Sequence, residues 1–146
     1  MKKLEEDYQM FDWWKKVFLN QYINFSGRAR RKEYWYFTLV NILAMLPLYL
    51  ILMATIAIES TVLMYIFATI FFIFGIALII PSIAVTVRRL HDTNKSGWCY
   101  FLSLIPLLSI VLLAFMVVEG DRSTNRYGKD PKNLYNEEEI NLIGTE

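Results

Sequence analysis

The sequence predicts an all-α fold, a helical integral membrane protein with three transmembrane helices and an N-terminal amphipathic interfacial helix. Three observations predict this fold. Hydrophobic residues occupy 55% of the 146 positions, above the ~45–50% usual for soluble domains. The 15 Lys or Arg and 14 Asp or Glu residues are confined to segments that flank three long uncharged stretches. Near the N-terminus, aromatic residues and lysines recur at helical spacing.

The N-terminal segment 10–24 is predicted to form the interfacial helix. Its apolar residues fall mainly within one broad arc at ~100° per residue, while Lys15 and Lys16 lie outside that arc. An aromatic face with lysines opposite suits a helix at the level of the lipid headgroups. Packing of the same face against the protein's own transmembrane helices is an equal alternative.

The three uncharged stretches predict transmembrane helices at about 34–58, 62–87 and 97–118. Each exceeds the ~20 residues that a helix needs to cross the hydrocarbon core, whereas a soluble helix carries charges along its exposed face. A chain of 146 residues cannot cover three such helices on all sides. Glu59 is the one charged residue between the first two stretches, which predicts a tight hairpin there. The whole chain, 1–146, is predicted to form a single membrane domain.

Residues 119–146 are predicted to form a polar tail rich in turn-forming residues. Eleven of the fifteen basic residues precede the first span or lie between the second and third, four lie in the tail, and the hairpin has none. The positive-inside rule therefore predicts a multi-pass protein with a cytoplasmic N-terminus, and three spans place the tail outside. If 97–118 instead folded back at Pro106 as a re-entrant hairpin, the tail would be cytoplasmic.

A first basic segment lies directly before the first span and contains Arg28, Arg30 and Arg31. Their guanidinium groups could bind phosphate or an anionic lipid headgroup. The alternative is that these arginines only orient the helix and extend to the interface.

A second basic segment joins the second and third spans and contains Arg88, Arg89, His91 and Asp92. We include these four residues in the predicted binding set for an anionic lipid or ligand. Asp92 lies four residues after Arg88 and three after Arg89, so a local ion pair is expected. His91 beside Asp92 could transfer protons, but no nucleophile motif accompanies the two residues. We therefore predict no catalytic residue and no enzyme.

Composition narrows the expected ligands. Cys99 and His91 are the one cysteine and the one histidine, which excludes an intrachain disulfide and a Cys/His zinc cluster. We expect no cofactor and no metal, and a formal charge of +1 argues against a nucleic-acid partner. The expected partners are membrane lipids, including anionic headgroups, together with a second copy of the chain or another membrane protein.

Two functions of different classes are compatible with these features. The first is a non-enzymatic membrane protein that acts through lipid or protein contacts at a basic cytoplasmic interface. The alternative is a small transporter or channel, which would be oligomeric because three helices enclose little space. The spans contain no ionisable Asp, Glu, Lys, Arg or His, and this counts against proton- or ion-coupled transport.

Three motifs carry a family resemblance: FSGRARRKEYW at 25–35, IPSIAVTVRRLHDTNKSGW at 80–98 and NRYGKDP at 125–131. Through these motifs the chain, from about Asp12 to Lys132, resembles the bacterial inner-membrane family known as domain of unknown function 805, the YhaH-like proteins. The resemblance implies a small integral protein of the bacterial cytoplasmic (inner) membrane. It implies no established activity.

Overall fold

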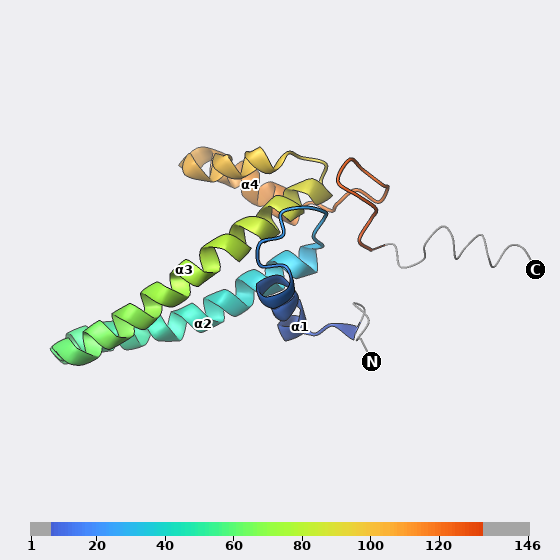
Figure 1. Cartoon of the computed structure of the whole chain (residues 1–146). Helices are drawn as coiled ribbons and strands as arrows, with labels where there is room; N and C mark the ends of the chain where they lie inside the picture. Colours follow the sequence, from blue (N-terminus) through green and yellow to red (C-terminus); the bar gives the residue numbers. More distant parts are fainter. Residues whose placement is uncertain (1–6, 133–146) are drawn as a thin grey trace, which may run out of the picture. The chain divides into compact units, whose positions relative to one another are not determined.

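The computed structural model describes residues 7–132, and the regular elements in this range are helical. In chain order they are α1 (Met10–Lys15), η2 (Lys16–Asn20), α2 (Arg31–Ala57), α3 (Thr61–Asp92), η3 (Gly97–Leu104) and α4 (Pro106–Val117) (Figure 1). The predicted all-α class is confirmed. The first six residues and the last fourteen residues of the predicted tail lie outside the described range.

The chain forms two compact units. Among the described residues, unit 1 comprises 7–24 and 32–85, and unit 2 comprises 25–31 and 86–132. The prediction of a single membrane domain stays a prediction.

Unit 1 is built on the antiparallel pair of α2 and α3, which lie side by side (Figure 1). The chain reverses at Glu59, whose φ of 55° lies in the left-handed region, and the Ser60 N–H donates to Thr55 O at 3.1 Å. Tyr49 and Phe71, equally distant in sequence from Ser60, bring their ring centroids to 6.5 Å. The hairpin expected at Glu59 is therefore confirmed.

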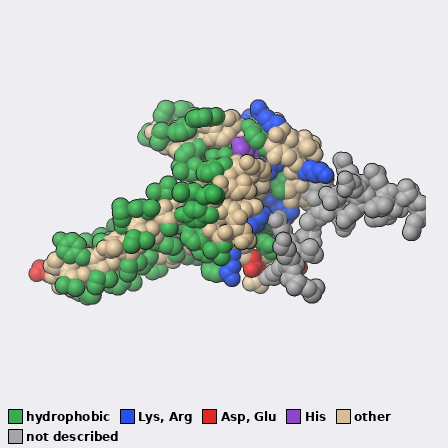
Figure 2. Space-filling model, in the orientation of Figure 1, with side chains coloured by type: hydrophobic (Ala, Val, Ile, Leu, Met, Phe, Trp, Pro, Cys, Tyr) green, Lys and Arg blue, Asp and Glu red, His purple; other side chains and the backbone are tan. Residues whose placement is uncertain are grey.

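Both helices of this pair are long and apolar enough to cross a membrane. At ~1.5 Å per residue, the 27 residues of α2 and the 32 residues of α3 extend over ~40 Å and ~48 Å, against ~30 Å of hydrocarbon. Large apolar side chains such as Leu43, Phe72 and Ile73 are more than half exposed, and hydrophobic side chains dominate the visible surface of this pair (Figure 2). Such a surface is solvated by acyl chains, as in a helical membrane protein.

The N-terminal helix of unit 1 is shorter than predicted, because α1 and its π-helical continuation η2 end at Asn20. It packs on α2: Trp14 Nε1 donates to Asn41 Oδ1 and Lys16 Nζ donates to Glu33 Oε2, both at 2.8 Å. Trp13 and Val17 are buried, whereas Phe11 and Leu19 are exposed. The edge of the helix that carries Trp13 and Val17 therefore packs against the protein, as the packing alternative expects, whereas Phe11 and Leu19 do not.

Unit 2 contains the third apolar segment, and here the structure differs from the continuous helix predicted over 97–118. The segment is divided into η3, of eight residues, and α4, of twelve, which pack against each other. Ile105 between them is extended, with φ −110° and ψ 115°. Pro106, the first residue of α4, causes this break because a proline disfavours helical geometry in the residue before it.

Candidate functional site

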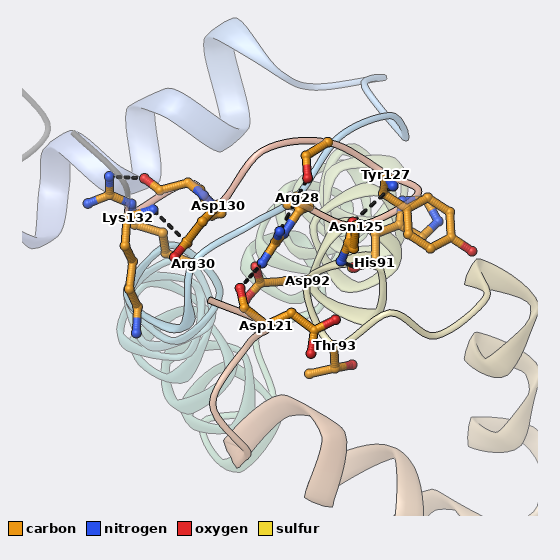
Figure 3. Close-up of polar contacts among 12 residues, drawn as sticks. Arg28, Arg30, His91, Asp92, Thr93, Asp121, Asn125, Tyr127, Asp130 and Lys132 are labelled. Atoms are coloured by element: carbon orange, nitrogen blue, oxygen red, sulfur yellow. Dashed lines mark hydrogen bonds and ion pairs between the residues drawn. The ribbon is translucent and has the colours of Figure 1, made fainter. Parts of the chain in front are cut away.

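The two basic segments meet in unit 2 around Asp92, the last residue of α3 (Figure 3). Arg28 Nε donates to Asp92 Oδ1 at 2.9 Å, and Arg89 Nη1 donates to Asp92 Oδ2. The three side chains are at most 4% exposed. Charge-assisted bonds of this kind are strong, and loss of one partner leaves another charge buried. We call Arg28, Arg89 and Asp92 the arginine–aspartate cluster.

The remaining nitrogens of Arg28 bind backbone carbonyls of the tail. Nη1 donates to Ser123 O at 2.7 Å and to Gly128 O at 3.3 Å, and Nη2 donates to Asp121 O. A guanidinium group offers five N–H donors in a fixed plane, so one side chain can hold several carbonyls at once. Arg28 therefore attaches the tail to the end of α3.

The segment that carries Arg28 is not helical, because α2 begins only at Arg31. Gly27 has a φ of 82°, which glycine adopts without strain. The Ala29 N–H then donates to Arg88 O at 3.0 Å, and Arg30 Nη2 donates to Pro131 O. Because this segment is not helical, Arg28 and Arg30 can reach different partners.

Two arginines bind the carbonyls at the C-terminal end of α4. Arg89 Nε donates to Met116 O at 3.3 Å, Arg89 Nη2 donates to Val118 O, and Arg31 Nη1 donates to Val117 O at 3.3 Å. The last carbonyls of a helix have no partner within the helix, and positive charge there complements the helix dipole. Arg89, which lies on α3, thus binds both the end of α4 and the Asp92 carboxylate.

A second carboxylate, Glu119, gathers cations at the surface of unit 2. It pairs with Lys132, with Arg31 at 3.6 Å and with Arg122 at 3.7 Å. The hydrogen bond from Lys132, followed by the charges of Lys132, Arg31 and Arg122, lowers the pKa of the Glu119 carboxyl below its ordinary value. We call these four residues the surface cluster.

The tail motif NRYG closes over the end of α3 (Figure 3). Asn125 Nδ2 donates to His91 O at 2.9 Å, and the Tyr127 ring stacks on the His91 imidazole with centroids 3.8 Å apart and planes 4° apart. Asn125 and Gly128 exchange backbone hydrogen bonds of 3.1 and 3.0 Å. Gly128 has a φ of 134°, which L side chains rarely adopt. The four residues form a tight turn attached to the helix end.

The helix end itself follows a common C-capping pattern. Asn94 is left-handed, with a φ of 57°, and the Lys95 N–H donates to Leu90 O at 2.9 Å. Arg126, from the tail motif, donates to both the side-chain and the backbone oxygen of Asn94 at 3.0 Å. The tail therefore also holds the turn that ends α3.

Two glycines allow the backbone to approach α3 closely. A Cβ on Gly120 would overlap the Asp92 carboxylate, and a Cβ on Gly97 would lie 2.8 Å from Val87 Cγ1. The adjacent Asp121 N–H donates to Asp92 O at 2.9 Å. Any larger residue at Gly120 would displace the arginine–aspartate cluster.

All seven predicted site residues lie in unit 2: Arg28, Arg30, Arg31, Arg88, Arg89, His91 and Asp92. The expected local ion pair is formed by Arg89 and Asp92. Arg28, Arg88 and Arg89 are buried, whereas Arg31 is exposed. Anionic lipid binding stays a prediction. Because the buried arginines are shielded from a headgroup, we expect the exposed cations to bind it.

His91 and Asp92 do not point to each other. His91 Nδ1 lies 3.2 Å from Gly27 O, and both Asp92 oxygens bind arginine. A carboxylate held in this way does not orient the imidazole for proton transfer. The geometry gives these residues a structural role.

Sequence reasoning missed four residues that complete this arrangement: Gly120, Glu119, Asn125 and Tyr127. The last two belong to the NRYG motif, which carried the family resemblance without indicating any contact. Gly120 stands beside a turn-rich segment, but turn propensity does not show that its hydrogen faces a buried carboxylate.

The sequence is similar to those of known proteins over most of its length. The family model described as "Protein of unknown function (DUF805)" matches residues 22–129. Inner membrane protein YhaI of Escherichia coli (strain K12) is 40% identical over 121 residues, covering 82% of this chain and 95% of the relative. Inner membrane protein YhaH of the same strain is 43% identical over 122 residues, covering 83% and 97%. No solved structure matches the chain. With these matches, the chain belongs to the DUF805 family of membrane proteins.

Proposed function

We propose that the protein is a non-enzymatic component of the bacterial inner membrane that binds anionic lipid headgroups on a basic cytoplasmic face. The described part of unit 2 supports this proposal through its charge. It contains ten Lys or Arg and four Asp or Glu residues, a net formal charge of +6. This excess is local, because the whole chain has a formal charge of only +1.

The exposed charges carry the proposal. Within the described residues of unit 2, one carboxylate, Glu119, is exposed, against six exposed cations: Arg31, Lys95, Arg122, Arg126, Lys129 and Lys132. The arginines of the arginine–aspartate cluster are saturated by internal bonds and do not belong to this set. The exposed cations, rather than the buried ones, are the groups that can meet phosphate.

The same unit presents a large apolar surface next to these cations. Trp98, Phe101 and Leu107 on η3 and α4 are exposed, and Figure 2 shows Lys and Arg side chains at the end where this hairpin joins the rest of unit 2. Apolar side chains beside cations suit the boundary between acyl chains and headgroups. Each Lys or Arg near an anionic membrane surface contributes ~1 kcal/mol of attraction. The positive-inside rule assigns this face to the cytoplasm.

Lipid retention tests the proposal. The full chain is reconstituted in nanodiscs that contain phosphatidylglycerol and phosphatidylethanolamine, and the lipids retained after extraction are identified by native mass spectrometry. We expect phosphatidylglycerol to be retained preferentially. In the variant Lys95→Gln, Arg122→Gln, Lys129→Gln, Lys132→Gln, that preference should fall by roughly tenfold or more, since four cations are lost.

The matched control is Ser123→Ala with Thr124→Ala, which alters exposed residues of the same segment without changing charge. Its lipid preference should equal that of the wild type. Equal retention of both lipids by the wild type would contradict the proposal. Solute uptake by proteoliposomes together with no lipid preference would favour the transporter alternative.

A further inference from the structure

Neither η3 nor α4 is long enough to cross a bilayer. The twelve residues of α4 extend over ~18 Å at ~1.5 Å per residue, and the eight residues of η3 over ~16 Å at ~2.0 Å per residue. The hydrocarbon core is ~30 Å thick. Each arm therefore matches one leaflet.

Both ends of this segment are fixed to the same end of α3. At the start, Gly97 lies against Val87, and Lys95 Nζ lies 5.7 Å from the centroid of the Phe115 ring near the other end of the segment. At the finish, Val118 O accepts from Arg89. The chain consequently leaves and returns at one place along α3.

The turn between the two arms has the properties needed in hydrocarbon. Leu104 and Leu107 are 72% and 76% exposed, and no charged residue occurs between Gly97 and Val118. The Ile105 N–H donates to Leu102 O at 3.2 Å, and Pro106 has no N–H to satisfy. A bilayer interior penalises backbone donors without partners, and these two positions present none.

We propose that η3 and α4 form a re-entrant hairpin that enters the acyl chains of one leaflet and returns to the side from which it came. The segment from Glu119 onward then lies on the same side as the loop at Lys95. With two full spans and this hairpin, all fifteen basic residues of the chain lie on one side, whereas three spans would place four of them on the other. The inference uses the proposed function only to name that side as cytoplasmic.

Cysteine accessibility tests this inference on the full chain in membranes. In a Cys99→Ser background, single cysteines are introduced at Lys95, Lys129 and Ser60, and a membrane-impermeant maleimide is added to spheroplasts or to inside-out vesicles. We expect Lys95→Cys and Lys129→Cys to react in the same preparation and Ser60→Cys, in the α2–α3 turn, to react in the other. Thr124→Cys provides a second tail position.

The control is a chain in which residues 97–118 are replaced by an uninterrupted Leu/Ala helix of equal length, so that Lys129→Cys should react in the same preparation as Ser60→Cys. In the chain that keeps its own residues 97–118, the inference would be overturned if the maleimide labelled Lys129→Cys in the same preparation as Ser60→Cys. Labelling of Lys129→Cys in both preparations would overturn it as well. A spin label at Leu104→Cys should be shielded from a polar relaxation agent. Accessibility equal to that at Lys95→Cys would also overturn it, because the hairpin would then lie outside the bilayer. Lipid retention does not enter these measurements, so a failure of the lipid-binding proposal is distinguished from a failure of this inference.

Discussion

Asp92 binds two cations of unit 2 and Glu119 binds three, but the two carboxylates occupy different surroundings. Asp92 is buried between two arginines, whereas Glu119 is exposed and pairs with Lys132 among others. At the surface, water can replace a lost ion partner, so an exposed pair contributes little. In the interior, water cannot replace a lost ion partner, so removing one partner of a buried pair is costly. The number of ion pairs around a carboxylate therefore says less about stability than its burial does.

The largest expected effect is that of Asp92→Asn. The substitution keeps the shape of the side chain but leaves the charges of Arg28 and Arg89 buried without their anion. We expect a loss of ~3–5 kcal/mol, the usual cost of breaking a buried pair. Thermal unfolding of the reconstituted protein measures the loss, with Glu119→Gln as the matched control. A melting temperature unchanged from that of the wild type would show that the cluster is not a stabilising element.

Gly120→Ala should have the second largest effect, because its Cβ would overlap the Asp92 carboxylate. Overpacking of this kind typically costs ~1–3 kcal/mol. Gly75→Ala is the control, since a Cβ at Gly75 meets only Met45 at an ordinary 3.6 Å. The same unfolding measurement compares the two variants. Equal stability of both would mean that Gly120 does not need to be a glycine.

Substitutions at His91 should separate stacking from hydrogen bonding. His91→Phe keeps an aromatic ring opposite Tyr127, and His91→Ala removes it. We expect the alanine variant to be less stable than the phenylalanine variant by ~0.5–1.5 kcal/mol, the usual contribution of an aromatic pair. If the two variants unfold at the same temperature, the stacked ring does not contribute, and a loss that both share relative to the wild type is then that of the hydrogen bond to Gly27 O.

Glu119→Gln should have the smallest effect, and its effect should depend on pH. The lowered pKa of Glu119 means that its contribution to stability is present above the ordinary value of a glutamate and is lost as the pH falls through the lowered value. The stability difference between wild type and Glu119→Gln should therefore shrink on acidification and also at high salt. A difference that stays constant with pH would show that the ion pairs of Glu119 do not contribute.

How far the sequence predicts this structure depends on the range of the interactions. The helices α2 and α3 were predictable because contact with lipid requires every turn to be apolar, a property visible in composition alone. The pair formed by Arg89 and Asp92 was predictable because its members are three residues apart. Arg28, the other partner of Asp92, lies 64 residues away, and no local pattern joins the two.

The division of the third apolar segment lies between these cases. Pro106 was visible as a position where the chain could fold back, but a proline also occurs inside α2, at Pro47, without ending the helix. The tail contacts with Arg89, Asp92 and Arg28 distinguish the two positions, because they return the chain to α3 after α4. Those contacts use backbone carbonyls, which every residue type supplies, so the residue pattern does not mark them.

The wide sequence separation around Arg28 also has a consequence for biosynthesis. Its carbonyl partner Asp121 is 93 residues further along the chain, which at ~5–20 residues per second is translated roughly 5 to 20 seconds later. During that interval α2 and α3 can be inserted, while Arg28 is solvated by water or headgroups. Closure of unit 2 is then a late event, and a chain that stops before Asp121 should enter the membrane yet leave the Nη1 and Nη2 groups of Arg28 without their carbonyl partners in the tail.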